Sequence, residues 1–142
     1  MPTATFLSNA TVNITVSAVT TDLSDQCTGV VIEAKKVMLR STAMGDTAEK
    51  FTAGLQDNTV TLSLYNSYGA GEVEAILYSA WGVPATLVIS PSGTTESATN
   101  PEWTITDAYL ESITPINSTV GELSAVQAVF RGGVATRDIV TP

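Results

Sequence analysis

Apolar and polar residues alternate along most of this chain, which is the pattern of half-buried β-strands. Val60, Leu62 and Leu64, for example, alternate with threonine and serine. Between residues 28 and 40 the alternation changes phase near Lys35, which predicts a bulge or short turn between two strands. The predicted strand segments are residues 11–19, 28–40, 59–64, 85–89, 103–113 and 123–130. This pattern predicts a mostly antiparallel β-sandwich or barrel.

Residues 71–82 have helical periodicity instead. Glu72 and Glu74 fall in the first turn, where the helix dipole favours negative charge, and Gly82 falls where a left-handed cap ends a helix. The apolar positions predict one buried face, formed by Val73, Ile76, Leu77, Ala80 and Trp81. We expect this helix to cover one open face of the sheet.

A polar segment, residues 41–55, separates two predicted strands and is too long for a tight hairpin. Gly45 and Gly54 bracket it, and the turn signal Asp57-Asn58 follows it. A long loop between two strands suits a protein that binds copies of itself. Few charged residues lie on the predicted edge strands, where they would oppose pairing with another chain. We therefore also expect edge pairing between subunits.

The length of 142 residues fits one domain with its own hydrophobic core, and no internal repeat or linker divides it. The expected fold is mainly β, an antiparallel sandwich or barrel with one flanking α-helix, a long inter-strand loop and N- and C-terminal arms. The expected boundaries are 1–142 for the domain, 1–10 for the N-terminal arm, 41–55 for the assembly loop, 71–82 for the helix and 134–142 for the C-terminal tail.

The chain is acidic, with 14 acidic against six basic residues and a formal charge of −8. This negative charge argues against a surface that binds nucleic acid or an anionic membrane. Only 14% of the residues are charged, so we expect other subunits to cover part of the surface. No apolar run is long enough to span a bilayer and no secretion signal is recognisable, so we expect folding in the cytoplasm of the producing cell.

The residue types needed for catalysis or metal binding are scarce. The chain has no histidine, and its single cysteine, Cys27, is expected to be a small buried apolar group. Neighbouring carboxylates are explained by turns or by the helix start, and Gly69-Ala70-Gly71 lacks the lysine of a phosphate-binding loop. We therefore expect no catalytic residues, no cofactor and no metal, and we expect that the protein is not an enzyme.

The aromatic and basic residues leave alternatives open. A set of aromatic residues could belong to the core, to subunit contacts or to a carbohydrate-stacking platform: Tyr65, Tyr68, Tyr78, Trp81, Trp103 and Tyr109. Arg131 and Arg137 could pair with acidic residues of a neighbouring subunit or remain as solvated charges at strand ends.

Several motifs occur in an order that resembles the major tail tube proteins of long-tailed, non-contractile bacteriophages. The resemblance covers residues 22–137, and its motifs are structural. They are Thr21-Asp22-Leu23-Ser24-Asp25, Thr42-Ala43-Met44-Gly45-Asp46, Phe51-Thr52-Ala53-Gly54-Leu55-Gln56-Asp57, Val73-Glu74-Ala75-Ile76-Leu77, Ser97-Ala98-Thr99-Asn100-Pro101 and Val120-Gly121-Glu122-Leu123.

This resemblance implies a structural virion protein of the phage tail. Subunits of the family close into hexameric rings, which stack into a tube around the tape measure protein and later conduct the viral genome into the host. The implied partners are further copies of the chain, the tape measure protein, the tail terminator and distal tail proteins, with DNA only in transit and no membrane. A ring of acidic subunits repels DNA phosphates if the acidic residues face inward.

The resemblance also implies that the loop 41–55 reaches a neighbouring subunit or ring, with Met44 and Phe51 as its apolar anchors. The expected interface residues are Met44, Gly45, Asp46, Phe51, Leu55, Arg131 and Arg137. Two other functions fit an acidic, β-rich chain without catalytic residues. One is a capsid decoration or other virion surface protein, and the other is a carbohydrate-binding, adhesin-like module.

Overall fold

The computed structural model describes residues 10–91 and 100–139 of the chain. Within these residues it contains ten strands and one helix. The strands are β1 (Thr11–Val16), β2 (Val19–Asp22), β3 (Cys27–Glu33), β4 (Lys36–Arg40), β5 (Phe51–Gln56), β6 (Thr59–Tyr65), β7 (Ala85–Ser90), β8 (Glu102–Ile113), β9 (Ala125–Arg131) and β10 (Val134–Asp138), and the helix is α1 (Val73–Ser79). The predicted mainly β, antiparallel fold with one helix is confirmed.

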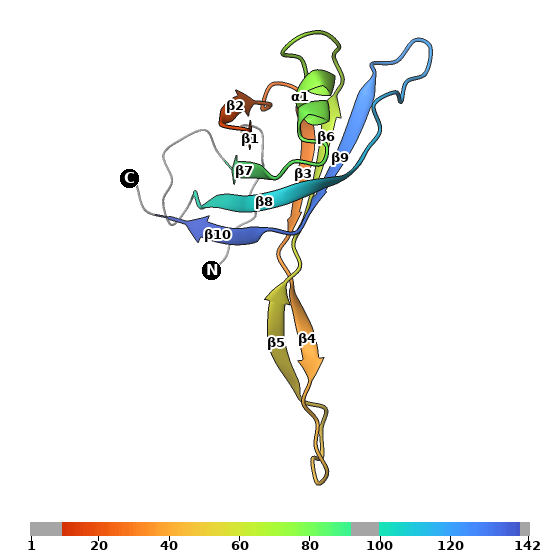
Figure 1. Ribbon diagram of the computed structural model, residues 1–142. Coiled ribbons are helices and arrows are strands. Elements are labelled where there is room, and N and C mark those ends of the chain that lie inside the picture. The colour runs from red at the N-terminus through yellow and green to blue at the C-terminus, as the bar shows by residue number, and fades with distance from the viewer. Residues whose placement is uncertain (1–9, 92–99, 140–142) are drawn as a thin grey trace.

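The long strand β8 connects the two halves of the main sheet. Its first half pairs with β7 on one side and β10 on the other, while its second half pairs with β9. The order of the sheet is β2-β1-β7-β8-β9-β6-β3, and all pairs are antiparallel. Asp107 has a φ of 62° between the two halves of β8, and Figure 1 shows β8 and β10 running across β3, β6 and β9. The sheet therefore folds over on itself and encloses a core.

The core lies between the two halves of this sheet and under the helix. Alternating residues of β1, β6, β7 and β9 point into it, as the sequence pattern predicts. Phe130, Leu62, Leu87 and Ile105 are completely buried there. The helix α1 adds Val73 and Leu77 to the same cluster, the residue after it adds Ala80, and the helix closes one end of the sandwich, at the top of Figure 1.

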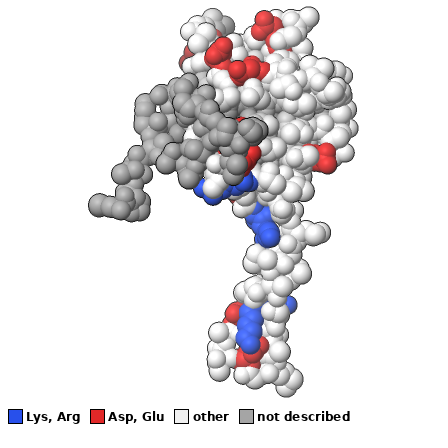
Figure 2. Space-filling model, turned by 90° about the vertical axis from the view of Figure 1, so that its left-hand side faces the viewer, with Lys and Arg blue, Asp and Glu red and all other residues white. Residues whose placement is uncertain are grey.

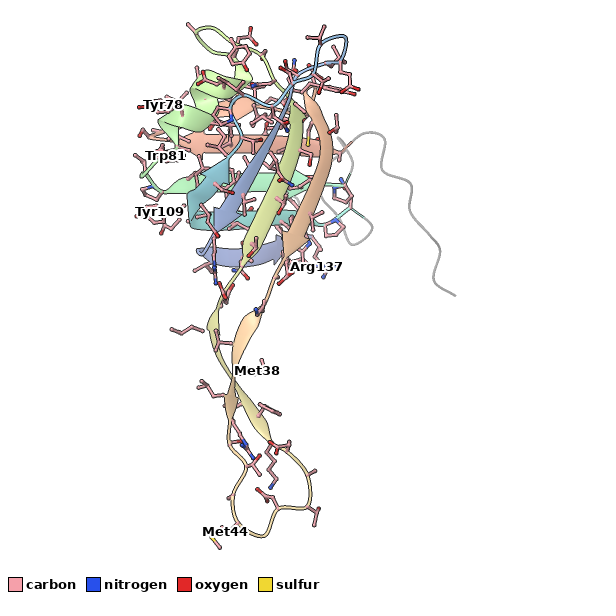
Figure 3. All side chains as sticks on the ribbon, turned by 90° about the vertical axis from the view of Figure 1, so that its right-hand side faces the viewer. Met38, Met44, Tyr78, Trp81, Tyr109 and Arg137 are labelled. Carbon is pink, nitrogen blue, oxygen red and sulfur yellow. The ribbon has the colours of Figure 1, made fainter. Side chains whose placement is uncertain are left out.

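Strands β4 and β5 form a separate two-stranded sheet, which we call the arm (residues 36–56). The arm continues the β3–β6 pair but projects away from the rest of the protein, which we call the body (Figures 1 and 3). No residue of the arm belongs to the buried core. The predicted division of residues 28–40 near Lys35 is confirmed, because β3 ends at Glu33 and β4 begins at Lys36.

Three predicted boundaries are wrong. The loop 41–55 is shorter than expected, because residues from Phe51 onward form β5. The helix covers Val73–Ser79 rather than 71–82, since the turn that follows Ser79 leads directly to Gly82, which has a φ of 76°. Trp81 consequently lies outside the buried face and is 56% exposed.

The C-terminal segment is also not a free tail over its first five residues. Val134–Asp138 pairs with β8 as β10, because Gly132 and Gly133 reverse the chain with φ values of 89° and 79°. Residues 1–9 of the expected N-terminal arm and residues 140–142 of the expected tail lie outside the described residues.

Candidate assembly surface

The arm is fixed to the body by the buried side chain of Asn58, which is 1% exposed. Its Oδ1 accepts a hydrogen bond from the Lys35 backbone N–H at 3.1 Å, and its Nδ2 donates to Gln56 Oε1 at 2.9 Å and to the Gly133 carbonyl at 3.1 Å. The Gln56 Oε1 also accepts the Ala135 N–H at 3.0 Å. Asn58 thus links both chain segments at the base of the arm to the turn before β10.

An ion pair strengthens the same base. The Arg131 Nε and Nη2 lie 3.2 Å from the two carboxylate oxygens of Asp57, and Nη1 lies 3.9 Å from Glu111 Oε2. The hydrogen bonds from Arg131 hold the pKa of Asp57 below its usual range, and the same pairing raises the pKa of Arg131. The Asp57 N–H also donates to the Lys35 carbonyl at 2.7 Å, which joins the two strands where the arm leaves the body.

Both faces of the arm expose apolar side chains. Met38 pairs with Ala53 and Arg40 with Phe51, so these four residues share one face, while Leu39 lies opposite Thr52 on the other. The exposed large apolar residues of the arm are Val37, Met38, Leu39, Met44, Phe51 and Leu55, with exposed fractions between 43% and 102%. A two-stranded sheet with apolar residues on both faces lacks a core of its own.

One face of the arm is hollowed. Val37, Leu39, Gly54 and Leu55 line this arm hollow, a shallow apolar concavity of about 420 Å³. Gly54 permits it, because a Cβ at this position would lie 2.9 Å from the Val37 carbonyl oxygen and 3.4 Å from the Leu39 side chain. The hollow therefore depends on a residue without a side chain.

The tip of the arm is an ordered turn. The Asp46 N–H donates to the Ala43 carbonyl at 3.2 Å, with Gly45 at a φ of 91°, and the Asp46 carboxylate accepts the Ala43 N–H at 2.7 Å. Lys50 Nζ lies 2.8 Å from Asp46, and this hydrogen bond, together with that from Ala43, lowers the pKa of Asp46. Met44 is fully exposed at the apex, where Figure 3 labels it.

A second group of contacts closes the tip. Arg40 Nη2 lies 2.9 Å from Glu49 Oε1, and the Thr42 hydroxyl donates to Glu49 Oε2 at 3.2 Å. The Lys50 N–H donates to the Thr42 hydroxyl at 2.9 Å. These bonds give the end of the arm a fixed shape.

The structure brings most of the predicted interface residues to the arm. Met44, Gly45, Asp46, Phe51 and Leu55 all lie on it. Arg131 lies at its base and is paired with Asp57 of the same chain. Arg137 is exposed on β10, at the side of the body nearest the arm (Figure 3).

Sequence reasoning missed Val37, Met38 and Leu39, which are exposed on β4. The signal was available in the sequence, since three consecutive apolar residues between Lys36 and Arg40 do not fit a half-buried strand.

Charge is unevenly distributed between the arm and the body. Residues 35–57 contain four of the six basic residues and three of the 14 acidic residues, which leaves two basic and eleven acidic residues for the rest of the chain. Figure 2 shows basic side chains at the base of the arm and along it, with acidic side chains beside them near its tip, and further acidic side chains at the opposite end of the body. The two ends of the molecule thus differ in charge.

A second exposed apolar surface lies on the body beside α1. We call it the aromatic groove, a concavity of about 350 Å³ lined by Glu74, Tyr78, Trp81, Ile113 and Pro115. Tyr78 is 70% exposed and Trp81 is 56% exposed, and Figure 3 shows both on the flank of the body above Tyr109. These aromatic residues therefore do not belong to the core.

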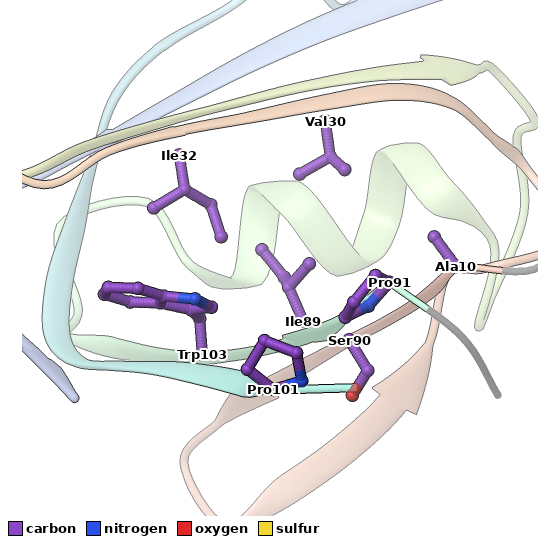
Figure 4. Close-up of a pocket in the computed structure, with 8 residues that line it drawn as sticks. All are labelled: Ala10, Val30, Ile32, Ile89, Ser90, Pro91, Pro101 and Trp103. Atoms are coloured by element: carbon purple, nitrogen blue, oxygen red, sulfur yellow. The ribbon is translucent and has the colours of Figure 1, made fainter. Parts of the chain in front are cut away.

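Trp103 lies in a different place. It lines an apolar cleft of about 200 Å³ where β3 approaches β7 and β8, and Figure 4 shows it on the side of Ile89 and Pro101, with Val30 and Ile32 opposite. Trp103 is half-buried and packs against the edge of the core.

The described residues contain little that could support chemistry. Cys27 is half-buried at the start of β3, and burial raises the pKa of its thiol, which disfavours the thiolate. No group of three potential metal ligands occurs in residues 10–91 and 100–139. Nor does this part of the chain contain a helix with the length and apolar character needed to cross a membrane.

Comparison with known proteins identifies the fold. No protein-family model and no curated protein sequence matches the chain. The SPP1 tail tube protein superposes with a TM-score of 0.72 at 11% identity, over 94% of this chain and 78% of that chain. A chain of the native gene transfer agent virion gives 0.67 at 7% identity, over 89% and 95%.

An extracellular contractile injection system supplies a third match. A chain of the PVC sheath/tube terminator in the extended state superposes with a TM-score of 0.64 at 11% identity, over 96% of this chain and 98% of that chain. The chain therefore has the fold of the SPP1 tail tube protein and of components of related particles. The resemblance to tail tube proteins seen in the sequence is confirmed at the level of the fold.

Proposed function

We propose that this chain is the subunit of a phage tail tube, which assembles into stacked rings and forms the conduit for genome delivery. The observation that carries the proposal is the arm, which exposes six large apolar side chains on a body that has the tail tube fold. Exposed apolar surface on a projecting, ordered element is typical of a protein interface.

The apolar side chains of the arm lie outside the core of the body. Burying one large apolar side chain contributes about 1.5–3 kcal/mol, and the arm leaves several of them in water. Its strands hold their register only through the hydrogen bonds of one strand pair, the tip contacts and the junction at Asn58. A second copy that covers the arm supplies the missing core.

The open edges of the body support ring formation. Strands β2 and β3 end the main sheet, so each leaves one side without a strand partner in the described part of the chain. Unpaired edges of this kind accept a strand from another copy. We propose lateral pairing of subunits into six-membered rings, with the arm contacting a different ring.

The conduit role agrees with the charge of the body. Outside residues 35–57 the chain has eleven acidic and two basic residues, which repels DNA phosphates and opposes binding of the genome in transit. The proposed partners in the virion tail are the tape measure protein in the lumen, the tail terminator and the distal tail proteins.

Concentrating the purified chain and viewing it by negative-stain electron microscopy, beside size-exclusion chromatography with light scattering, tests this function. We expect hollow, open-ended tubes of uniform diameter. Replacing Met44-Gly45-Asp46 with a short Gly-Ser linker should leave a folded monomer that builds no tubes, because the ordered turn and its apolar apex are lost. A tip variant that builds tubes of normal length would contradict the role of the arm tip.

A capsid decoration role predicts a different outcome from the same experiment. A decoration protein forms closed trimers or remains monomeric at every concentration, so closed particles in place of tubes would favour it. The adhesin-like alternative requires glycan binding at the aromatic groove, whose lining offers Glu74 as its only charged side chain.

A further inference from the structure

We propose that the aromatic groove of one copy is the docking site for the arm of a second copy. This inference rests on the proposed function and names the surface that receives the arm. Its first support is position, because the groove lies on the flank of the body beside α1 while the arm leaves from the opposite end (Figures 1 and 3). The arm of the same chain cannot reach it.

The length of the arm supports a contact between copies. Residues 36–45 form one leg, so at a rise of about 3.3 Å per residue the arm extends roughly 30 Å from the body. A contact between unlike surfaces at opposite ends of the molecule is heterologous, and its repetition along one axis gives an open-ended stack when the rotation between copies does not close a ring.

Both surfaces expose apolar side chains. The arm hollow is apolar and floored by Gly54, and the rings of Tyr78 and Trp81 project from the body with most of their area exposed. Insertion of one ring into the hollow covers apolar area on both copies. Tyrosine and tryptophan are the residue types that most often dominate interfaces in this way.

Charge complementarity favours the same pairing. Glu74 lines the aromatic groove, and acidic side chains gather at this end of the body (Figure 2). The arm carries Lys36, Arg40 and Lys50, of which Arg40 and Lys50 pair with Glu49 and Asp46 of the arm itself. Residues 35–57 hold four basic and three acidic residues, against two basic and eleven acidic residues in the rest of the chain. Docking brings the basic arm beside Glu74, with cation–π contact to Trp81 available to an arginine or lysine.

Photo-crosslinking of the full chain tests the contact. The variant carries p-benzoylphenylalanine in place of Tyr78, and a mixture of isotopically light and heavy chains identifies crosslinks between copies by mass spectrometry. We expect crosslinks from position 78 to residues 37–55 of another copy in the assembled state, and their loss on dilution to monomer. The control places the crosslinker at Thr20, which is exposed on the edge strand β2, and its crosslinks between copies should reach the body and not residues 37–55.

Substitutions give an independent readout. Trp81→Ala should raise the concentration needed for assembly about tenfold or more, as for a central interface aromatic residue, while Ser79→Ala, exposed on the same helix but outside the groove, should change it less than about twofold. Glu74→Lys should also raise it, and Asp25→Lys, the same charge change in an exposed turn, should not. Circular dichroism checks that each variant is folded.

The outcomes separate this inference from the proposed function. Tubes whose crosslinks from position 78 reach residues 1–9, the 114–124 loop or any segment other than the arm would overturn the docking site and leave the tube function standing. Tubes that tolerate Trp81→Ala and Glu74→Lys without change would do the same. Failure of the unmodified chain to form tubes at any concentration would overturn both.

Discussion

At the scale of single residues, several polar side chains at the base of the arm are held by hydrogen bonds and ion pairs. Asn58 is buried and uses both ends of its amide, and Asp57 and Arg131 pair directly beside it. These contacts have a structural role. They hold a projecting element at one angle to the body, which is what a repeated contact between identical subunits requires.

Asn58→Ala should lower the free energy of unfolding of the monomer by about 1–3 kcal/mol, because it leaves the Lys35 N–H and the Gly133 carbonyl without these partners. Urea denaturation measures the change, and hydrogen exchange should become faster in residues 36–56. Asn117→Ala, at an exposed loop position, is the control and should stay within about 0.5 kcal/mol. An equal effect of both substitutions would contradict the role of Asn58.

The Asp57–Arg131 pair should make the junction sensitive to acid. The pKa of Asp57 is lower in the folded protein than in the unfolded chain, so the pair stabilises the fold above the ordinary carboxyl pKa of about 3.9. That stabilisation is lost as the pH falls through the lower, folded value. Asp57→Asn should therefore lower the urea midpoint at pH 7 and lower it less at pH 3.

Asp25→Asn, which removes a carboxylate from an exposed turn, is the control and should leave the midpoint unchanged at neutral pH. An Asp57→Asn effect of the same size at both pH values would show that the pair does not act through its charge.

At the scale of elements, alternation in the sequence predicted the strands that are buried on one face. Alternation did not reveal where a turn interrupts an alternating segment. Residues 11–19 read as one strand, but Ser17 and Ala18 adopt φ values of 50° and 67° and turn the chain between β1 and β2. Neither glycine nor asparagine marks this turn, so its position could not be read from residue type.

Two other elements depend on partners that a local pattern does not reveal. The pairing of β10 with β8 is set by residues more than twenty positions apart, so the segment resembled a free tail. The arm strand β4 has apolar residues in succession because neither of its faces packs on the core. The location of the assembly loop was nevertheless predictable from its length and from Gly45 and Gly54.

The body should fold without the arm. The Asp57 N–H bonds to the Lys35 carbonyl, so the two ends of the arm are adjacent, and an Asn-Gly turn can replace residues 36–56. Since no core residue is removed, we expect a circular dichroism melt that stays cooperative, and by light scattering nothing larger than a single ring. Collapse of the fold, or tube formation by this variant, would contradict the assignment of the arm to assembly.

At the scale of the whole molecule, the arm and the aromatic groove lie toward opposite ends and differ in charge. Such a polar subunit favours open-ended repetition. In the proposed tube, the sheet edges that are unpaired in the described residues pair within a ring, and the arm makes a contact in a second direction. Two independent directions of association are sufficient to build a tube.

The most direct test is a cryo-electron microscopy map of the full chain assembled at high concentration. We expect a hollow, open-ended assembly of stacked rings in which residues 36–56 are ordered against a different copy. A closed oligomer, or an assembly in which the arm remains in solvent and contacts no other copy, would contradict it.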